Sequence, residues 1–220
     1  MNDRLEIRKY TFTVEGETEE WYFRWLQEQI NHCPDRTCNV FIDARVQQCP
    51  RRFIKRVNAK TTPCVTHICD VESKDPDHVR KFQTILADMK DAHEQKRIEY
   101  RLGYSNYAFE LWIVLHKQNC NGSLSHRRQY LDPINRAFGE RFEDLDHYKC
   151  ENAFNRCLSK LTLDDVKAAI RRAEGINTAN KDSQKRIIHC KGYSYFEENP
   201  SLSVHEVVRT ILIECGLMNR

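Results

Sequence analysis

Short β-favouring runs alternate with amphipathic helical stretches along the first half of this chain, and this order restricts the fold more than any other feature. Alternation of apolar residues predicts strands, and apolar residues at helical spacing predict helices. The strands are expected at 7–14, 38–44, 64–70 and about 98–104, and the helices at 18–31, 50–59, from Asp75-Pro76 onward and at 107–117. Such a β-α-β-α order is typical of a mostly parallel sheet flanked by helices. We therefore predict an α/β fold with a four-stranded sheet in residues 1–122.

Residues 123–220 are predicted to form a helical C-terminal extension that packs on this core. Helices are expected at about 125–138 and 151–160, and at 163–174 after the capping pair Thr162 and Asp165. A last helix is expected after Ser203, which forms a capping pair with Glu206. The apolar face of this helix should pack on the sheet.

Carboxylates follow two of the predicted strands. Glu15 ends the first strand beside Gly16, and Asp70 and Glu72 follow the third. Because ligands gather outside the carboxyl ends of parallel strands, these acids should converge if the two strands are neighbours. Converging carboxylates repel each other unless a cation lies among them, and an all-oxygen ligand set suits Mg²⁺ or Mn²⁺. A single such acid is more often a solvated cap, but two strand ends of the same kind favour a metal site.

Three blocks of this sequence resemble known families. The run VEGETEEWYF, at 14–23, resembles the first motif of Toprim domains, the metal-binding fold shared by primases, topoisomerases and overcoming-lysogenization-defect nucleases, and DVE, at 70–72, stands where that fold carries Asp-x-Asp. The block 105–112 with Leu115-His116 resembles the SNPxFELWxLLH block of RloB-like proteins, and 199–205 resembles their NPSTxVH ending. The chain departs from the pattern at Glu72, which replaces the second Asp, and at Tyr107-Ala108.

The resemblance implies a set of site residues. The expected metal ligands are carboxylates: Glu15, Glu19, Asp70, Glu72 and Glu110. The expected catalytic residues are two of these acids and a lysine in a shifted Tyr-x-Lys region: Glu15, Asp70 and Lys149. For Lys149, the alternative interpretation as an ordinary surface lysine has about the same weight as the catalytic one.

Further candidates have a structural alternative of similar weight. Ser105 and Asn106 could hold a phosphate or simply end the fourth strand, and His116 is a second-tier candidate because a histidine at the end of an apolar helix is more often structural. Arg127 and Arg128 belong to one of three basic clusters, the others lying at 51–60 and 171–186. These clusters could lead a phosphate backbone to the acids, or could be solvated helix faces.

Composition narrows the class of protein. No segment of the 220 residues approaches the ~20 apolar residues that cross a bilayer, and the start has no apolar signal-peptide core, so a cytoplasmic protein without membrane contact is expected. The ten cysteines are scattered and form no Cys-x-x-Cys pair, which predicts reduced thiols and no zinc.

The favoured function is divalent-metal-dependent hydrolysis of phosphodiester bonds in DNA or RNA, tRNA included. The resemblance implies an effector of bacterial antiphage or abortive-infection defence, encoded near an ABC-type ATPase, and the chain itself has no Gly-x-x-x-x-Gly-Lys-Ser/Thr loop. The main alternative is a non-catalytic Toprim-like subunit that binds the ATPase or nucleic acid. A primase-type nucleotidyl transferase is a minor third interpretation.

Overall fold

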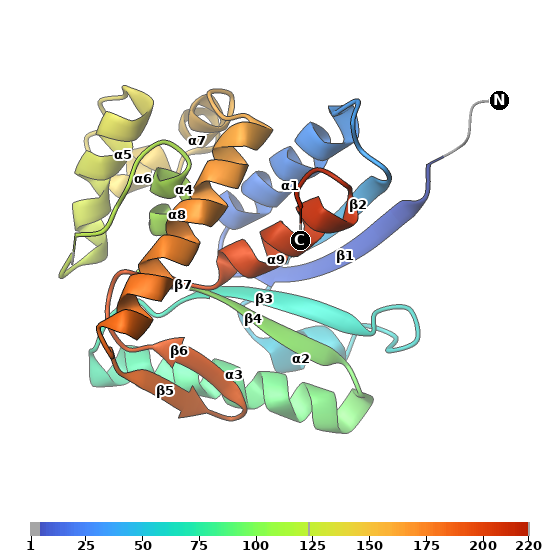
Figure 1. Cartoon of the computed structure of the whole chain (residues 1–220). Coiled ribbons are helices and arrows are strands. Elements are labelled where there is room, and N and C mark those ends of the chain that lie inside the picture. Colours follow the sequence, from blue (N-terminus) through green and yellow to red (C-terminus); the bar gives the residue numbers. More distant parts are fainter. Residues whose placement is uncertain (1–4, 123, 220) are drawn as a thin grey trace.

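A mostly parallel five-stranded sheet, in the order β2-β1-β3-β4-β7, runs through the protein (Figure 1). The computed structural model describes residues 5–122 and 124–219. The strands are β1 (Ile7–Val14), β2 (Asn39–Val46), β3 (Cys64–Asp70), β4 (Glu99–Asn106) and β7 (Ser201–Leu202). The first four are parallel, as predicted. The fifth was not predicted: β7 pairs antiparallel with the end of β4, Ser105 opposite Leu202, and two residues are too few to give a strand pattern.

Helices cover both faces of the sheet. One face carries α2 (Pro50–Ile54) and α3 (Pro76–Lys96), whereas α1 (Glu17–His32), α4 (Glu110–Leu115) and α9 (Val204–Glu214) lie on the other (Figure 1). The remaining helices are a 3₁₀-helix, η1 (Arg127–Tyr130), then α5 (Leu131–Phe138), α6 (Leu145–Tyr148), α7 (Glu151–Leu158) and α8 (Leu163–Asp182).

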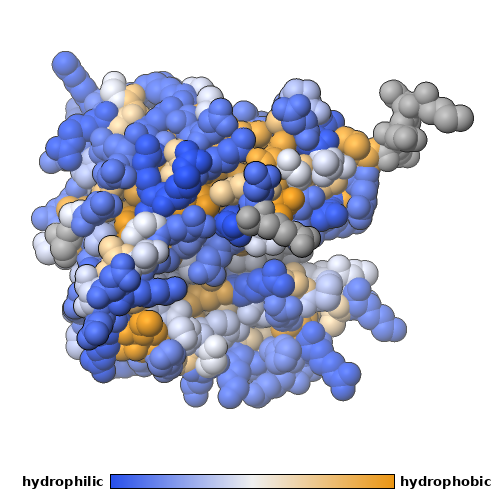
Figure 2. Space-filling model, in the orientation of Figure 1, coloured by the Kyte–Doolittle hydropathy of each residue, from blue (hydrophilic) through white to orange (hydrophobic). Residues whose placement is uncertain are grey.

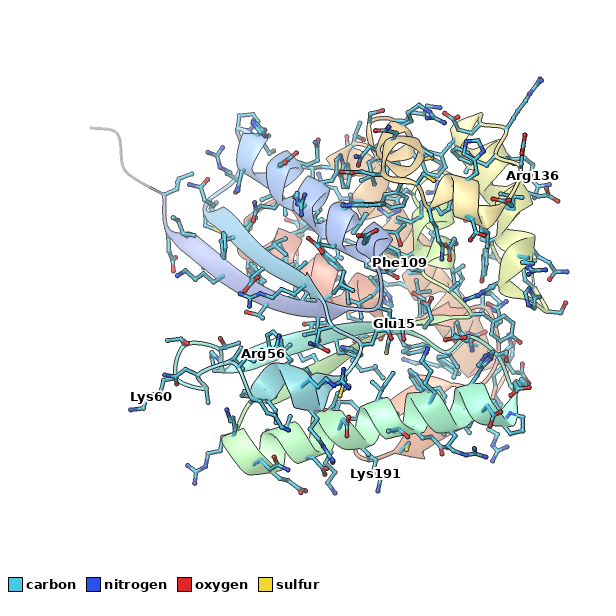
Figure 3. All side chains as sticks on the ribbon, turned by 180° about the vertical axis from the view of Figure 1, so that it is seen from behind. Glu15, Arg56, Lys60, Phe109, Arg136 and Lys191 are labelled. Atoms are coloured by element: carbon cyan, nitrogen blue, oxygen red, sulfur yellow. The ribbon has the colours of Figure 1, made fainter. Side chains whose placement is uncertain are left out.

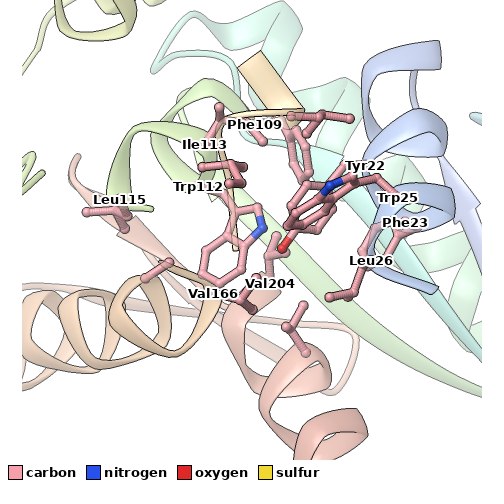
Figure 4. Close-up of a cluster of buried hydrophobic side chains, with 14 of the residues drawn as sticks. Tyr22, Phe23, Trp25, Leu26, Phe109, Trp112, Ile113, Leu115, Val166 and Val204 are labelled. Carbon is pink, nitrogen blue, oxygen red and sulfur yellow. The ribbon is translucent and has the colours of Figure 1, made fainter. Parts of the chain in front are cut away.

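Aromatic side chains from distant parts of the chain form the centre of the larger core. The ring of Trp112 in α4 lies 6.2 Å from that of Tyr22 in α1, and Tyr22 also meets Phe109 at 5.7 Å. Val166 of α8 and Val204 of α9 belong to the same buried cluster (Figure 4). The C-terminal part therefore shares its core with the N-terminal sheet.

The segment after residue 122 is not wholly helical, which corrects one expectation. A hairpin of β5 (Ile187–Cys190) and β6 (Tyr193–Phe196) packs beside α3, with Tyr195 against Phe82 at 4.9 Å. The second strand buries both Tyr195 and Phe196, and its four residues are too few to show a strand pattern.

Helix ends differ from the predictions where side chains form turns or extend a buried face. The helix predicted at 50–59 ends at Ile54, and Asn58 forms a separate turn farther on by accepting the backbone N–H of Lys60. In contrast, α8 continues past 174 to Asp182, since Ile176 and Asn180 prolong its buried face. The capping box of Thr162 and Asp165 is confirmed. Ser203 precedes α9 as predicted but does not cap it.

The outer edge of the sheet is closed by side chains of α1. The strand β2 has β1 on one side only, and the N–H groups of Val40 and Ile42 donate instead to Asn31 Oδ1 at 2.8 Å and Gln27 Oε1 at 2.6 Å. Asn31 also donates its amide to the carbonyl of Val40 at 2.9 Å, so one side chain replaces part of a missing strand.

The ten cysteines are free in the structure. Cys69 and Cys215 are buried as predicted, whereas Cys64 is only half-buried. Within 5–122 and 124–219, no helix combines the length and apolar character needed to cross a membrane.

Candidate functional site

A polar cavity of about 370 Å³ opens where β1 and β3 end. Figure 3 shows Glu15 at the middle of the face on which the cavity lies, between the first turn of α1 and α3. Charged side chains dominate its lining: Glu15, Glu17, Glu19, Asp70, Glu72, Lys81, Arg127 and Lys149. The cavity thus collects four of the five predicted metal ligands, the predicted lysine and one predicted arginine.

The register of the two strands brings Glu15 to Asp70. Val14 lies beside Ile68, so both strands end at the same edge, and the backbone N–H of Asp70 donates to Glu15 Oε2 at 3.0 Å. Gly16 then permits a close approach, because a Cβ there would lie only 3.1 Å from Glu19 Oε2. A larger residue at 16 would push against the Glu19 carboxylate.

Burial and mutual repulsion make these carboxylates unusually easy to protonate. Burial raises the pKa of Asp70 well above its ordinary value, and the charges of Glu15, Glu19 and Glu110 add to the effect. Burial also raises the pKa of Glu15, against the opposing charge of Lys81. The Glu19 side chain, which accepts the Thr18 hydroxyl at 3.0 Å, has its pKa raised to about 7 by burial. Such a cluster favours any cation that enters it.

Two lysines already offset part of this negative charge. Lys149, which follows α6, places Nζ 2.9 Å from Oε1 of the buried Glu110. Lys81 of α3 places Nζ 2.7 Å from Glu72 Oε1 and 3.8 Å from Glu15 Oε1. Burial opposes ionisation of Glu72, but the hydrogen bond and charge of Lys81 outweigh it and lower the pKa of Glu72.

The chemistry of the donor atoms suits a hard divalent cation, but their geometry suits it only in part. All the acidic candidates offer oxygen, and two of their oxygens, Glu15 Oε1 and Glu110 Oε2, are buried without a hydrogen-bond partner. Such orphaned acceptors are costly unless something binds them. In the described part of the chain, however, no three His, Cys, Asp or Glu side chains are grouped as a ready ligand shell. A bound ion would therefore require side-chain rotations, for which Glu72 and the lysines have the freedom because they are partly exposed.

Other predicted residues lie away from the cavity. Ser105 and Asn106 are fully buried in β4, where Asn106 donates to the carbonyls of Phe196 and Glu197 at 3.3 Å, so they end the strand and do not face a phosphate at the surface. His116 is buried, with Nε2 3.1 Å from the Tyr22 hydroxyl and Nδ1 2.9 Å from the Trp112 carbonyl, which is a structural role. Glu110 does not line the cavity itself but contacts Lys149, which does. Arg128 is exposed and does not line the cavity.

Sequence reasoning missed Lys81, Gln48 and Thr18, which also line the cavity. Lys81 lies on the helix that opens with Asp75-Pro76, and its polar face reads as ordinary solvated surface. Only the position of the third strand relative to that helix brings Lys81 to Glu72. Thr18 lies inside the run that resembles the Toprim motif, but only the acidic residues of that run were predicted as ligands.

The model of the RloB-like protein family matches residues 10–211. The chain belongs to the RloB-like family. No curated protein and no solved structure matches it. The family match of this RloB-like protein covers four strands of the sheet entirely, β1 from Tyr10 onward, and every acid that lines the cavity.

Proposed function

We propose that this RloB-like protein is a Toprim-type nuclease that uses Mg²⁺ or Mn²⁺ to hydrolyse phosphodiester bonds in DNA or RNA, tRNA included. The observation that carries the proposal is one cavity lined by Glu15, Glu19, Asp70 and Glu72 at the carboxyl ends of two parallel strands, with Lys149 beside them. Parallel-sheet proteins bind their ligands at this edge. Defence against phage is the setting that the family resemblance suggests.

The carboxylates would hold the cation. Glu15 and Asp70 are proposed as its main ligands, with Glu72, Glu19 and Glu110 completing one or two positions. When bound, the cation would supply a more acidic water and would neutralise charge on the phosphate. Partial burial of these ligands supports the role, because the raised pKa values of Glu15 and Asp70 reflect a site that gains from added positive charge.

Lys149 and Arg127 are proposed to face the phosphate. Both line the cavity, and a fixed cation beside a cleaved phosphate stabilises the negative charge that develops there. Lys149 is held by its contact with Glu110, which keeps its ammonium group at the cavity wall. Glu15, whose Oε1 has no hydrogen-bond partner among the described residues, is proposed either to bind the cation or to act as a general acid or base.

An ABC-type ATPase is the proposed protein partner. The sequence offers no phosphate-binding loop of its own, so control by ATP would come from a second chain. Copurification of the chain with the ATPase encoded nearest to it is the direct measurement of this part of the proposal.

Cleavage of nucleic acid by the purified protein tests the enzyme assignment. Plasmid, single-stranded DNA and tRNA are incubated with Mg²⁺ or Mn²⁺, with and without the ATPase. The wild type is expected to cleave at least one of them, and Glu15→Gln and Asp70→Asn are each expected to reduce the rate at least ~100-fold, since each removes ligand charge at nearly constant shape. Far-ultraviolet circular dichroism checks that both variants are folded.

Two outcomes would contradict the proposal. Cleavage by both variants at the wild-type rate would move the chemistry to another site. A wild type that binds nucleic acid or the ATPase but never cleaves would favour the non-catalytic subunit.

A further inference from the structure

A basic groove follows helix α8, apart from the carboxylate cavity. Two cavities, of about 390 Å³ and about 150 Å³, adjoin there because both are lined by Asn121, Gly175 and Ile176. Gly175 has nothing within 4 Å of the position that a Cβ would take, so the helix surface is open at the point where the two cavities meet. In Figure 2, hydrophilic residues dominate the part of the surface that α8 occupies in Figure 1.

The charged residues of this groove all carry the same sign. Arg171 and Arg172 line the larger cavity and Lys185 the smaller, and no carboxylate of the described residues lines either one. This contrasts with the other cavity, in which acids are the majority. The polar neighbours Asn119, Asn121 and Ser183 add hydrogen-bonding groups. The groove therefore presents cations and neutral polar groups, which is the chemistry that binds an anion.

The arginines are not neutralised by acids nearby. Across 5–122 and 124–219, neither Arg171 nor Arg172 has a carboxylate oxygen within 4.0 Å, and Lys185 has only a long contact of 3.9 Å with Glu198. Arg172 instead donates Nη1 to the carbonyls of Leu115 and His116, at 2.6 Å and 3.0 Å. These bonds fix one edge of the guanidinium, which reduces the entropy lost when the group binds a phosphate.

The groove is close to the carboxylate cavity along the chain. Asn121 lines the groove and Arg127 lines the cavity, and six residues of chain can span at most about 21 Å. One strand of a duplex carries a phosphate every ~3.4 Å, so about six phosphates bridge that separation. A nucleic acid of about six nucleotides is therefore long enough to reach from Asn121 to Arg127.

We propose that the α8 groove binds backbone phosphates of the nucleic acid several nucleotides away from the carboxylate cavity. The inference rests on the proposed function in that it names the same substrate class, a nucleic acid longer than about six nucleotides. It assigns to Arg171, Arg172 and Lys185 the recognition of phosphodiester groups independent of sequence.

Binding without cleavage tests the groove. Fluorescence anisotropy in EDTA measures the affinity of the full chain for a labelled 20-nucleotide RNA hairpin, a 20-base-pair DNA duplex and a four-nucleotide RNA. The variant Arg171→Glu/Lys185→Glu is compared with Lys90→Glu/Lys191→Glu, which makes the same charge change at two exposed lysines, one in α3 and one between β5 and β6, that line neither cavity of the groove. Thermal unfolding confirms that both variants are folded.

The groove variant is expected to bind a long probe at least tenfold more weakly than the wild type, and the control variant less than twofold more weakly. The slope of log K against log salt should fall by about 1.4–1.8 for the loss of two phosphate contacts. The four-nucleotide RNA, which carries fewer phosphates, should bind the wild type more weakly than the long probes do. Equal losses in both variants would assign the effect to net charge, and unchanged binding or a wild type that binds no long probe would equally overturn the groove. The experiment measures binding and not cleavage, so its result does not depend on whether the protein is a nuclease. A failure of the groove proposal can therefore be told apart from a failure of the nuclease proposal.

Discussion

Glu110 is a buried carboxylate whose one cationic partner among the described residues is Lys149, and this pair links the core to the candidate site. The carboxylate side chain is 3% exposed and the lysine 38%. A buried charge that loses its partner is left without compensation, which costs more than the intact pair contributes. The stability of the protein and the charge of its cavity are therefore coupled at this contact.

Replacement of Lys149 tests that coupling. Lys149→Met should lower the free energy of unfolding by about 1–3 kcal/mol, less than the ~3–5 kcal/mol of a fully buried pair that is broken, because the lysine is partly in solvent. Urea denaturation measures it. Glu110→Gln/Lys149→Met should regain most of the loss, and a double variant less stable than Lys149→Met would contradict the assignment.

His116 gives the protein a pH dependence that can be isolated by mutation. Burial lowers its pKa to about 4, below the ordinary 6.5, so the folded protein keeps the ring neutral where the unfolded chain protonates it. The resulting stability is fully present above pH 6.5 and is lost as the pH falls toward 4.

The wild type should therefore lose about 2 kcal/mol of stability between pH 7 and pH 5 relative to His116→Gln. Urea denaturation of both proteins at the two pH values measures the difference, and the raised-pKa carboxylates, common to both proteins, cancel. A difference independent of pH would show that His116 takes up its proton as readily in the folded protein as in the unfolded chain, which would contradict a lowered pKa.

Residue by residue, the site was predictable where a local pattern pointed to it. Glu15 and Asp70 stand at strand ends, and these strands were predicted from alternation at 7–14 and from a short apolar, β-favouring run at 64–70. Lys81 could not be predicted, because its approach to Glu72 depends on how α3 packs beside β3. Ser105 and Asn106 show the opposite case: their family-like block is real, but β7 and β6 bury them.

Among the elements, α9 begins after Ser203, a serine at the N-cap position whose side chain does not cap the helix. Ser203 stands at the N-cap, yet its hydroxyl donates to the Leu102 carbonyl at 2.9 Å and accepts the N–H of Tyr104 at 3.0 Å. These bonds satisfy β4 beyond the point where β7 stops pairing with it. The capping pattern therefore predicted the start of α9 correctly, although the Ser203 side chain bonds to β4 and does not cap the helix.

Ser203→Ala should destabilise the protein by about 1–3 kcal/mol, because it leaves a strand N–H and a carbonyl without partners. Thr210→Ala on the same helix, whose hydroxyl bonds only within α9, should cost less than about 0.5 kcal/mol and serves as the control. Thermal unfolding compares the two. Equal effects would mean that the strand contact contributes nothing.

Long periodic elements were predictable and short ones were not. Strands β1 and β3 and helices α1 and α3 carry enough residues for a period to be read, whereas β5, β6, β7 and α6 have four residues or fewer. Their positions depend on tertiary contacts, such as Tyr195 with Phe82, that no local window contains.

At the scale of the whole molecule, the shared core determines what can fold alone. The division at residue 122 was made from the sequence and stays a prediction, but the buried cluster of Figure 4 joins Trp112 to Val166 and Val204 across it. Removal of everything after 122 would expose Trp112 and the neighbouring apolar residues of α4 to water.

We expect residues 1–122 alone to remain unfolded or aggregated, and the full chain to unfold in one transition. Urea denaturation followed by both tryptophan fluorescence and circular dichroism measures this, with coincident curves for the full chain. A cooperatively folded 1–122 fragment would show that the N-terminal part is an autonomous domain.

The side chains of Asn31 and Gln27 along β2 have a consequence for how copies of the protein meet in a crowded solution. An uncovered strand edge is a template on which an identical chain can add its own strand, and repeated addition produces fibrous aggregates. By occupying the N–H groups of Val40 and Ile42, the amides of α1 remove the docking points that such growth would use. The β2 edge is therefore closed to a further strand at Val40 and Ile42, and two amides of α1 protect this part of the sheet against the addition of copies.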